Sequence, residues 1–200
     1  MEKKKTDTEI LKVLLKQFTI KWTITALSRE ISMSRVGIWK VLKQLETKRL
    51  ILLSPIGDGR TSTFNIGLNW ENPVLEKSLS LILTEDASKN QRWMNNFSEL
   101  ENKVDFLIIY GSIIYSSKEA NDIDVLGVVS NKKGFAGIEE TMRKIQKTQI
   151  KKIHSENFTQ IEFRDEIRKL NKVFIDAIKK GVVLFGQEKF IKFIKEISII

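Results

Sequence analysis

The first third of the chain alternates between helical and strand-like hydrophobic spacing. Apolar residues recur at every third or fourth position in three segments, which predicts helices over 8–18, 24–31 and 35–48. Residues 50–53 form a short apolar run, and residues 63–68 alternate between apolar and polar positions as strands do. Proline, glycine and aspartate between these runs favour a turn, so we predict three helices followed by a hairpin.

The remainder of the chain predicts a helical connector and then a unit of strands and helices. Residues 70–103 have helical spacing, and Pro73 stands where a helix can begin without losing a hydrogen bond. Four segments follow, with strand-like patterns at 104–110, 123–129 and 150–158 and a helical pattern near 138–147. This order predicts an α/β unit.

The C-terminal quarter of the chain is predicted to be mostly helical. Thr159 and Glu162 form a capping-box pattern, which predicts the start of a helix. Helical spacing then continues to the end, with interruptions at Gly181 and Gly186. We therefore predict an α+β fold with three parts, which are an N-terminal unit at 1–69, a connector at 70–103 and an α/β domain at 104–200.

Composition narrows the classes of protein to which the chain can belong. Apolar residues make up 42% of the 200 residues, which is enough for folded cores. With no cysteine and one histidine, disulfides and thiolate-rich or histidine-rich metal sites are excluded. No apolar run is long enough to span a membrane, and the basic N-terminus lacks the apolar segment of a signal peptide. We expect a cytoplasmic protein with no membrane partner.

Positive charge is concentrated in the first third of the chain. Residues 1–69 contain 13 lysines and arginines against 6 acidic residues, which is +7 of the total net charge of +9. Such asymmetry favours a polyanionic partner for this part of the protein. The alternative is a generally lysine-rich composition with no bearing on function.

The segment TALSREISMSRVGIWKVLKQLETKRLI, residues 25–51, places a helix, a tight turn and a second helix ahead of the hairpin. In order and spacing, residues 7–69 resemble the winged helix-turn-helix family. The resemblance implies DNA binding, with the third helix in the major groove, the hairpin tip at the backbone or minor groove, and a homodimer that reads two half-sites. The alternative is a winged helix used for dimerisation or for binding another protein. The expected DNA-binding residues are Ser34, Arg35, Gly37, Lys40, Lys43 and Arg60.

Asp122 and Asp124 stand two residues apart in a strand-like apolar run. Alternation along a strand puts both side chains on one face, about 6–7 Å apart. Burying charge is costly unless it is paired or holds a metal, and Mg²⁺ is usually bound by one or two carboxylates together with substrate phosphates. Gly111 and Ser112, which nine residues separate from Asp122, would allow a phosphate to approach the backbone closely. Two solvated acids after an ordinary turn are the alternative.

Residues 104–160 resemble the nucleotidyltransferase superfamily with the polymerase-β-type fold. The resemblance extends loosely to residues 171–190, which look like the closing helix and strand of such domains. The resemblance rests on a hydrophobic-Gly-Ser pattern at 110–112, a nine-residue spacing, and an Asp-hydrophobic-Asp-hydrophobic pattern at 122–125. It implies that Asp122 and Asp124 hold Mg²⁺ and act in catalysis, and that Gly111 and Ser112 bind a nucleoside triphosphate. The segment IIYS that follows Ser112 departs from the family, because many minimal members carry a basic residue and a glycine there.

The resemblance also implies a third carboxylate, on a later strand just before the next helix. Counting back from the Thr159 cap places Glu156 there, as a metal ligand or as the catalytic base. Gln160 and Glu162 are weaker candidates, because they belong to the start of the helix. His154 lies two residues earlier on the same face. It is either a neighbour of the site or a hydrogen-bonded structural residue, and we assign it no catalytic role.

Together the resemblances imply a winged helix followed by an α/β nucleotidyltransferase domain with a small mixed sheet. The implied function is DNA binding combined with Mg²⁺-dependent transfer of a nucleoside monophosphate from a triphosphate to an unidentified hydroxyl acceptor. The alternative is a non-catalytic transcriptional regulator whose second domain senses nucleotide or dimerises, which the IIYS segment and the glutamate at position 156 favour. A third reading is the antitoxin-like half of a toxin–antitoxin pair.

Overall fold

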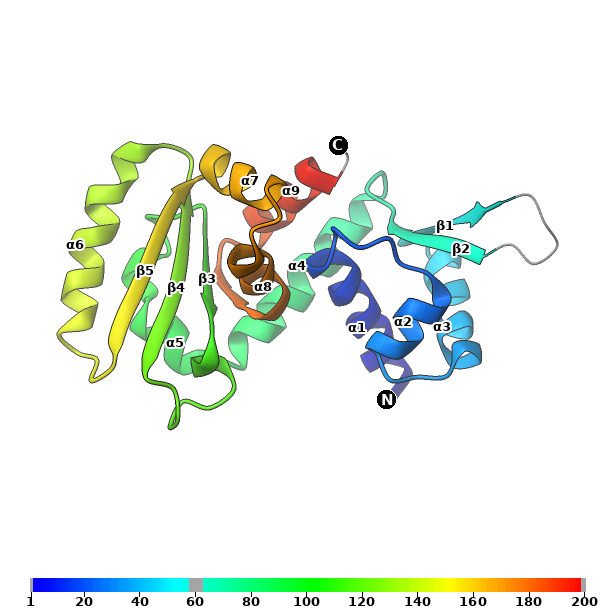
Figure 1. Ribbon diagram of the computed structural model, residues 1–200, viewed down its shortest axis with the longest axis horizontal. Coiled ribbons are helices and arrows are strands. Elements are labelled where there is room, and N and C mark those ends of the chain that lie inside the picture. Colours follow the sequence, from blue (N-terminus) through cyan, green and yellow to red (C-terminus); the bar gives the residue numbers. More distant parts are fainter. Residues whose placement is uncertain (1, 58–62, 199–200) are drawn as a thin grey trace. The chain divides into compact units, whose positions relative to one another are not determined.

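A computed structural model describes residues 2–57 and 63–198 of the chain as two compact units (Figure 1). The boundary between the units lies between Ile82 and Leu83. It falls within helix α4 (Pro73–Ser88), so the segment expected as a connector contributes to both units. Within the described ranges, no helix is both long and apolar enough to cross a membrane.

The first unit contains three helices followed by an antiparallel hairpin, in the predicted order. The inward residues of the third helix, Ile38, Leu42 and Leu45, are fully buried. The second and third helices each begin with a side-chain cap, because the hydroxyls of Thr23 and Ser34 accept backbone hydrogen bonds from Ala26 and Gly37. The elements are α1 (Glu2–Lys16), α2 (Ile24–Glu30), α3 (Arg35–Thr47), β1 (Ile51–Ile56) and β2 (Thr63–Leu68).

The second unit is built on a small mixed sheet with the strand order β5-β4-β3-β6 (Figure 1). Strand β3 pairs antiparallel with β4 and with β6, whereas β4 and β5 are parallel. An α+β fold with a small mixed sheet is therefore confirmed. The strands are β3 (Phe106–Tyr110), β4 (Asp122–Val129), β5 (Lys152–Thr159) and β6 (Val182–Phe185). The helices of this unit after α4 are α5 (Gln91–Asn96), α6 (Phe135–Gln146), α7 (Gln160–Arg168), α8 (Lys172–Lys180) and α9 (Gln187–Ser198).

Strand β6 lies in the region whose periodicity predicts helices. Its four residues are all buried, and Gly181 and Gly186 flank it. A short apolar run has no alternation that would separate a buried strand from a helix. A Cβ at Gly186 would overlap the carbonyl of Asp105, so this glycine allows the chain to leave β6 close to β3. The two interruptions seen in the sequence are therefore the ends of a strand.

Both faces of the sheet are apolar over most of their area. One face carries Leu107, Ile109, Ile123 and Val125, which pack with residues of α5 and α6. The other face is covered by a group of aromatic rings that includes residues of α7, α8 and α9. These rings belong to Phe106, Phe158, Phe163, Phe174, Phe190 and Phe193. The acids of β4 lie on this second face, at the opposite end of β3 from Phe106.

Asp105, which directly precedes β3, joins four segments of the second unit. Its carboxylate is buried and accepts hydrogen bonds from Ser130 (2.6 Å) and Gln160 (2.8 Å). It also forms an ion pair of 2.8 Å with Lys189 of α9. Burial alone would raise the pKa of Asp105, but the hydrogen bonds from Lys189, Ser130 and Gln160 together hold it below its usual value. Sequence analysis did not single out this residue.

We expect Asp105→Asn to destabilise the protein at pH 7 by about 1–3 kcal/mol, because the variant removes a buried charge-assisted hydrogen-bond network. The folded pKa lies below the unfolded value near 3.8, so this stabilisation is present above that pH and disappears as the pH falls through the folded pKa. The difference between variant and wild type should therefore shrink in urea unfolding at pH 3. Asp176→Asn, which removes an exposed ion pair with Lys180, should change stability much less. An equal effect of Asp105→Asn at both pH values would contradict this account.

Candidate functional site

The two acids of β4 lie where the aromatic cover of the sheet ends. Asp122 and Asp124 point to the same face, while Ile123 between them is buried on the other face. In the strand register, Asp124 stands opposite Tyr110 of β3 on one side and opposite His154 of β5 on the other. The expected pairing of the carboxylates on one face is therefore present, at the beginning of β4.

His154 lies between the two carboxylates. Its Nδ1 is 3.4 Å from Oδ2 of Asp122 and 3.6 Å from Oδ1 of Asp124. One donor atom from each of the three side chains lies within 4.8 Å of the others, and no other such group of three occurs in residues 2–57 and 63–198. The side chains of Asp122, Asp124 and His154 are 35%, 25% and 46% exposed, so the group is open to solvent.

The electrostatics of this face disfavour two free carboxylates. Burial raises the pKa of Asp124, the negative charge of Asp122 raises it further, and His154 offsets only part of this effect. Burial also raises the pKa of Tyr110 to about 12, with smaller contributions from the charges of Glu156 and Asp124. The Tyr110 hydroxyl therefore stays protonated at neutral pH, and a cation between the acids would relieve their repulsion.

Gly111 lies directly against Asp124. Its backbone has φ +79° and ψ −165°, a region that is accessible almost only to glycine. A Cβ at this position would overlap Oδ2 of Asp124, whose other oxygen faces His154. The glycine is therefore required both by the backbone and by the space that the carboxylate occupies. Ser112 follows it as the first residue of a short 3-10 helix, and its side chain is exposed.

Glu156 lies outside the converging group. The parallel register of β4 and β5 places it opposite Leu126, one alternate position beyond His154. Its side chain is exposed on the same face, and its charge acts on Tyr110. The resemblance implied Glu156 as the third metal ligand or the base, and sequence analysis gave His154 no catalytic role. In the structure it is His154 that converges with the acids, because the strand register places it opposite Asp124.

The donor set fits a divalent cation. Two carboxylates supply the oxygen ligands that hard cations prefer, and the imidazole adds a nitrogen ligand. Asp122, Asp124 and His154 are therefore the residues that could hold a metal ion in the described part of the chain.

The residues expected to bind DNA belong mainly to α3. Arg35, Lys40 and Lys43 are exposed, and Trp39 packs on Phe64 of the hairpin with ring centroids 5.4 Å apart. Lys43 forms an ion pair of 2.7 Å with Glu46 and lies over the Trp39 ring. Ser34 is the helix cap, and Gly37 is half-buried against Met33. Arg60 lies outside the described residues.

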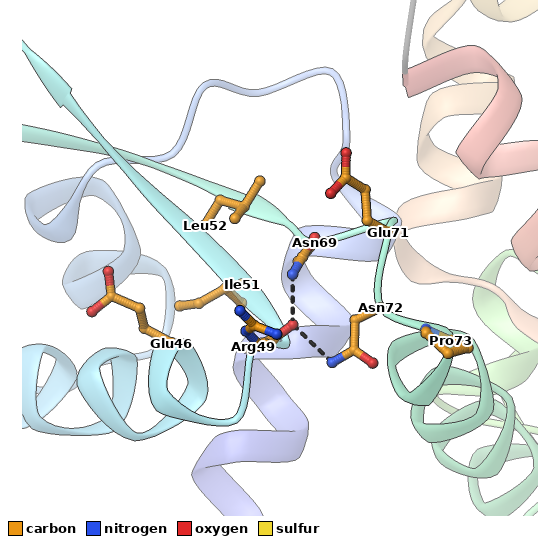
Figure 2. Close-up of a pocket in the computed structure, with 8 residues that line it drawn as sticks. All are labelled: Glu46, Arg49, Ile51, Leu52, Asn69, Glu71, Asn72 and Pro73. Carbon is orange, nitrogen blue, oxygen red and sulfur yellow. Dashed lines mark hydrogen bonds between the residues drawn. The ribbon is translucent and has the colours of Figure 1, made fainter.

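A pocket of about 510 Å³ lies in the first unit where α3, β1 and the start of α4 meet (Figure 2). None of the predicted site residues lines it. The carbonyl of Arg49, a residue with φ +56°, accepts hydrogen bonds of 2.9 Å from the amides of Asn69 and Asn72. These bonds hold the turn between α3 and β1 against the segment that leads into α4. The lining residues are Glu46, Arg49, Ile51, Leu52, Asn69, Glu71, Asn72 and Pro73.

Comparisons with models of known protein families, with curated proteins and with solved structures found no match to this chain. The functional interpretation therefore depends on the geometry of the site and on the motifs of the sequence.

We expect Gly111→Ala to lower the free energy of unfolding by about 1–3 kcal/mol, the range for a non-glycine residue forced into this backbone region. Gly137→Ala in α6 is the matched control, because a Cβ there meets no atom within 4 Å. The control should raise stability by about 0.5–1 kcal/mol, since alanine favours a helix over glycine. Urea unfolding measures both, and equal effects of the two variants would show that Gly111 carries no such constraint.

Proposed function

We propose that the second unit is a minimal nucleotidyltransferase domain and that the first unit binds DNA as a winged helix. The transferase would move a nucleoside monophosphate from a nucleoside triphosphate to a hydroxyl acceptor. The observation that carries the proposal is the pair Asp122 and Asp124 on one open sheet face, with the backbone of Gly111 against Asp124. Gly111 and Asp124, which lie at opposite ends of the Gly-Ser and Asp-hydrophobic-Asp motif, are thus in contact in the folded unit.

The residues around this face can be given distinct roles. Asp122 and Asp124 would hold Mg²⁺, which would offset the negative charge of the triphosphate and support attack at phosphorus. Ser112 is exposed beside Gly111, where its hydroxyl and the narrow glycine backbone would contact phosphate oxygens. These contacts would orient the α-phosphate toward the acceptor.

The proposed reaction forms one bond and breaks another at the α-phosphorus. The acceptor oxygen bonds to phosphorus, the bond to the bridging oxygen of the β-phosphate breaks, and pyrophosphate leaves. The acceptor must lose a proton, and Glu156 is an exposed carboxylate on this face that would accept it. The hydroxyl of Tyr110 stays protonated and feels the charges of Glu156 and Asp124, so it would be available to donate a hydrogen bond to a substrate oxygen at this face.

One observation favours the non-catalytic alternative. The segment after Ser112 packs inward, since Ile113 is buried and Ile114 packs against the apolar core. It therefore offers no basic side chain to the triphosphate at this point. A domain that binds nucleotide without transferring it would then act as a sensor for the DNA-binding unit.

The first test is calorimetric titration of ATP, GTP, CTP and UTP into the protein with Mg²⁺. We expect Mg²⁺-dependent binding of at least one nucleotide. The double variant Asp122→Asn/Asp124→Asn should lose it, because the two amides carry no negative charge with which to hold the cation. The double variant should remain folded and at least as stable as wild type, since a like-charge pair is removed.

The matched control for this titration is Asp176→Asn, which removes one acidic charge from exposed α8. It should bind nucleotide as wild type does. If folded wild-type protein binds none of the four nucleotides, the transferase and sensor proposals both fail.

The DNA-binding proposal is supported by the exposed cations Arg35 and Lys40 on α3 and by the net charge of +7 over residues 1–69. We expect Arg35→Ala/Lys40→Ala to weaken binding to mixed-sequence duplex DNA and to reduce the dependence of log affinity on log salt by about 1 for each phosphate that the variant no longer neutralises. Lys192→Ala, an exposed lysine of α9, is the control and should change neither quantity. Fluorescence anisotropy across a salt series measures both, and equal behaviour of the two variants would remove α3 from the DNA interface.

A further inference from the structure

The third side chain of the candidate site is an imidazole. His154 is held on β5, where the parallel register places it directly opposite Asp124. A polymerase-β-type site built only from carboxylates would instead need Glu156 at this position, and the register excludes that arrangement. The nature of the third donor therefore distinguishes this site from a purely oxygen-lined one.

Neither distance from His154 to the acids is that of a short charge-assisted hydrogen bond. A charge-assisted hydrogen bond between nitrogen and a carboxylate is typically about 2.7–2.9 Å long. The Nδ1 atom is 3.4 Å from one carboxylate and 3.6 Å from the other, so it is nearly equidistant from both and tightly bonded to neither. The two carboxylates and the imidazole thus each offer a donor atom within 4.8 Å of the others.

The mixed donor set changes which cation the site should prefer. Mg²⁺ takes oxygen ligands almost exclusively and keeps several waters, whereas imidazole is a ligand for first-row transition metals. Mn²⁺ accepts carboxylate oxygen readily and binds nitrogen ligands more strongly than Mg²⁺ does. Its charge would also offset the repulsion between Asp122 and Asp124.

We propose that His154 is a metal ligand through Nδ1 and that it makes this site select Mn²⁺ over Mg²⁺. The inference deepens the proposed function, since it concerns the cation of the same site, but it requires only that the chain bind a metal. Glu156 then remains outside the metal shell and is left for proton transfer.

The test uses Mn²⁺ alone, with the full chain and no nucleotide. Electron paramagnetic resonance of free Mn²⁺ measures its affinity, and competition with Mg²⁺ measures selectivity. Pulsed electron spin echo measurements report whether a nitrogen is bound directly to Mn²⁺. The variants are His154→Ala and Glu156→Gln, both at exposed positions of β5, and circular dichroism checks that each is folded.

We expect wild type to bind Mn²⁺ more tightly than Mg²⁺ and to show the nitrogen signal. His154→Ala should lose the signal and weaken Mn²⁺ binding by at least about 10- to 100-fold, because loss of a direct ligand should cost no less than loss of a group that only supports one. The same substitution should change Mg²⁺ affinity much less, and Glu156→Gln should keep both the signal and the selectivity.

Four results would overturn the proposal. The first two are absence of Mn²⁺ binding to folded wild type and Mn²⁺ binding without a nitrogen signal. The other two are unchanged selectivity in His154→Ala and loss of Mn²⁺ binding in Glu156→Gln. Metal binding with the nitrogen signal but no nucleotide binding in the titration above would instead refute the transferase alone and leave the role of His154 intact.

Discussion

The close approach between the Gly111 backbone and the Asp124 carboxylate is the constraint on which the candidate site depends. Strands β3 and β4 pair antiparallel, and Asp124 stands opposite Tyr110, so the chain leaves β3 beside the acid. Any side chain at Gly111 would occupy the position of one carboxylate oxygen, while the other oxygen faces His154. The Gly-Ser turn, the acid pair and the histidine are thereby joined into one surface, although three separate strands supply or flank them.

The same sheet holds carboxylates in two opposite electrostatic environments. At one end, Asp105 is buried among Ser130, Gln160 and Lys189, and its pKa is lowered because hydrogen bonds favour the charged form. At the other end, Asp124 is beside a second acid, and its pKa is raised because burial and like charge disfavour ionisation. The first arrangement stabilises the fold by itself. The second would gain stability from a cation, which is the arrangement expected of a binding site.

Helix α3 of the first unit has a buried apolar face and an exposed basic face. Ile38, Leu42 and Leu45 are buried at helical spacing, and the basic residues lie on the remaining surface. Lys43 is partly neutralised by Glu46 and is in contact with Trp39, so Arg35 and Lys40 are the stronger candidates for phosphate contacts.

Local patterns in the sequence determined the helices of the first unit, the hairpin, the capping box at Thr159 and the common face of Asp122 and Asp124, because each depends on spacing or on turn chemistry within a few residues. Periodicity did not reveal strand β6, since a buried four-residue apolar run has no alternation, and only the resemblance pointed to a strand there. Only the tertiary structure decided that His154 rather than Glu156 meets the acids and that Lys189 pairs with Asp105. Both outcomes depend on the pairing and packing of segments far apart in the chain, and spacing along one segment carries no information about that register.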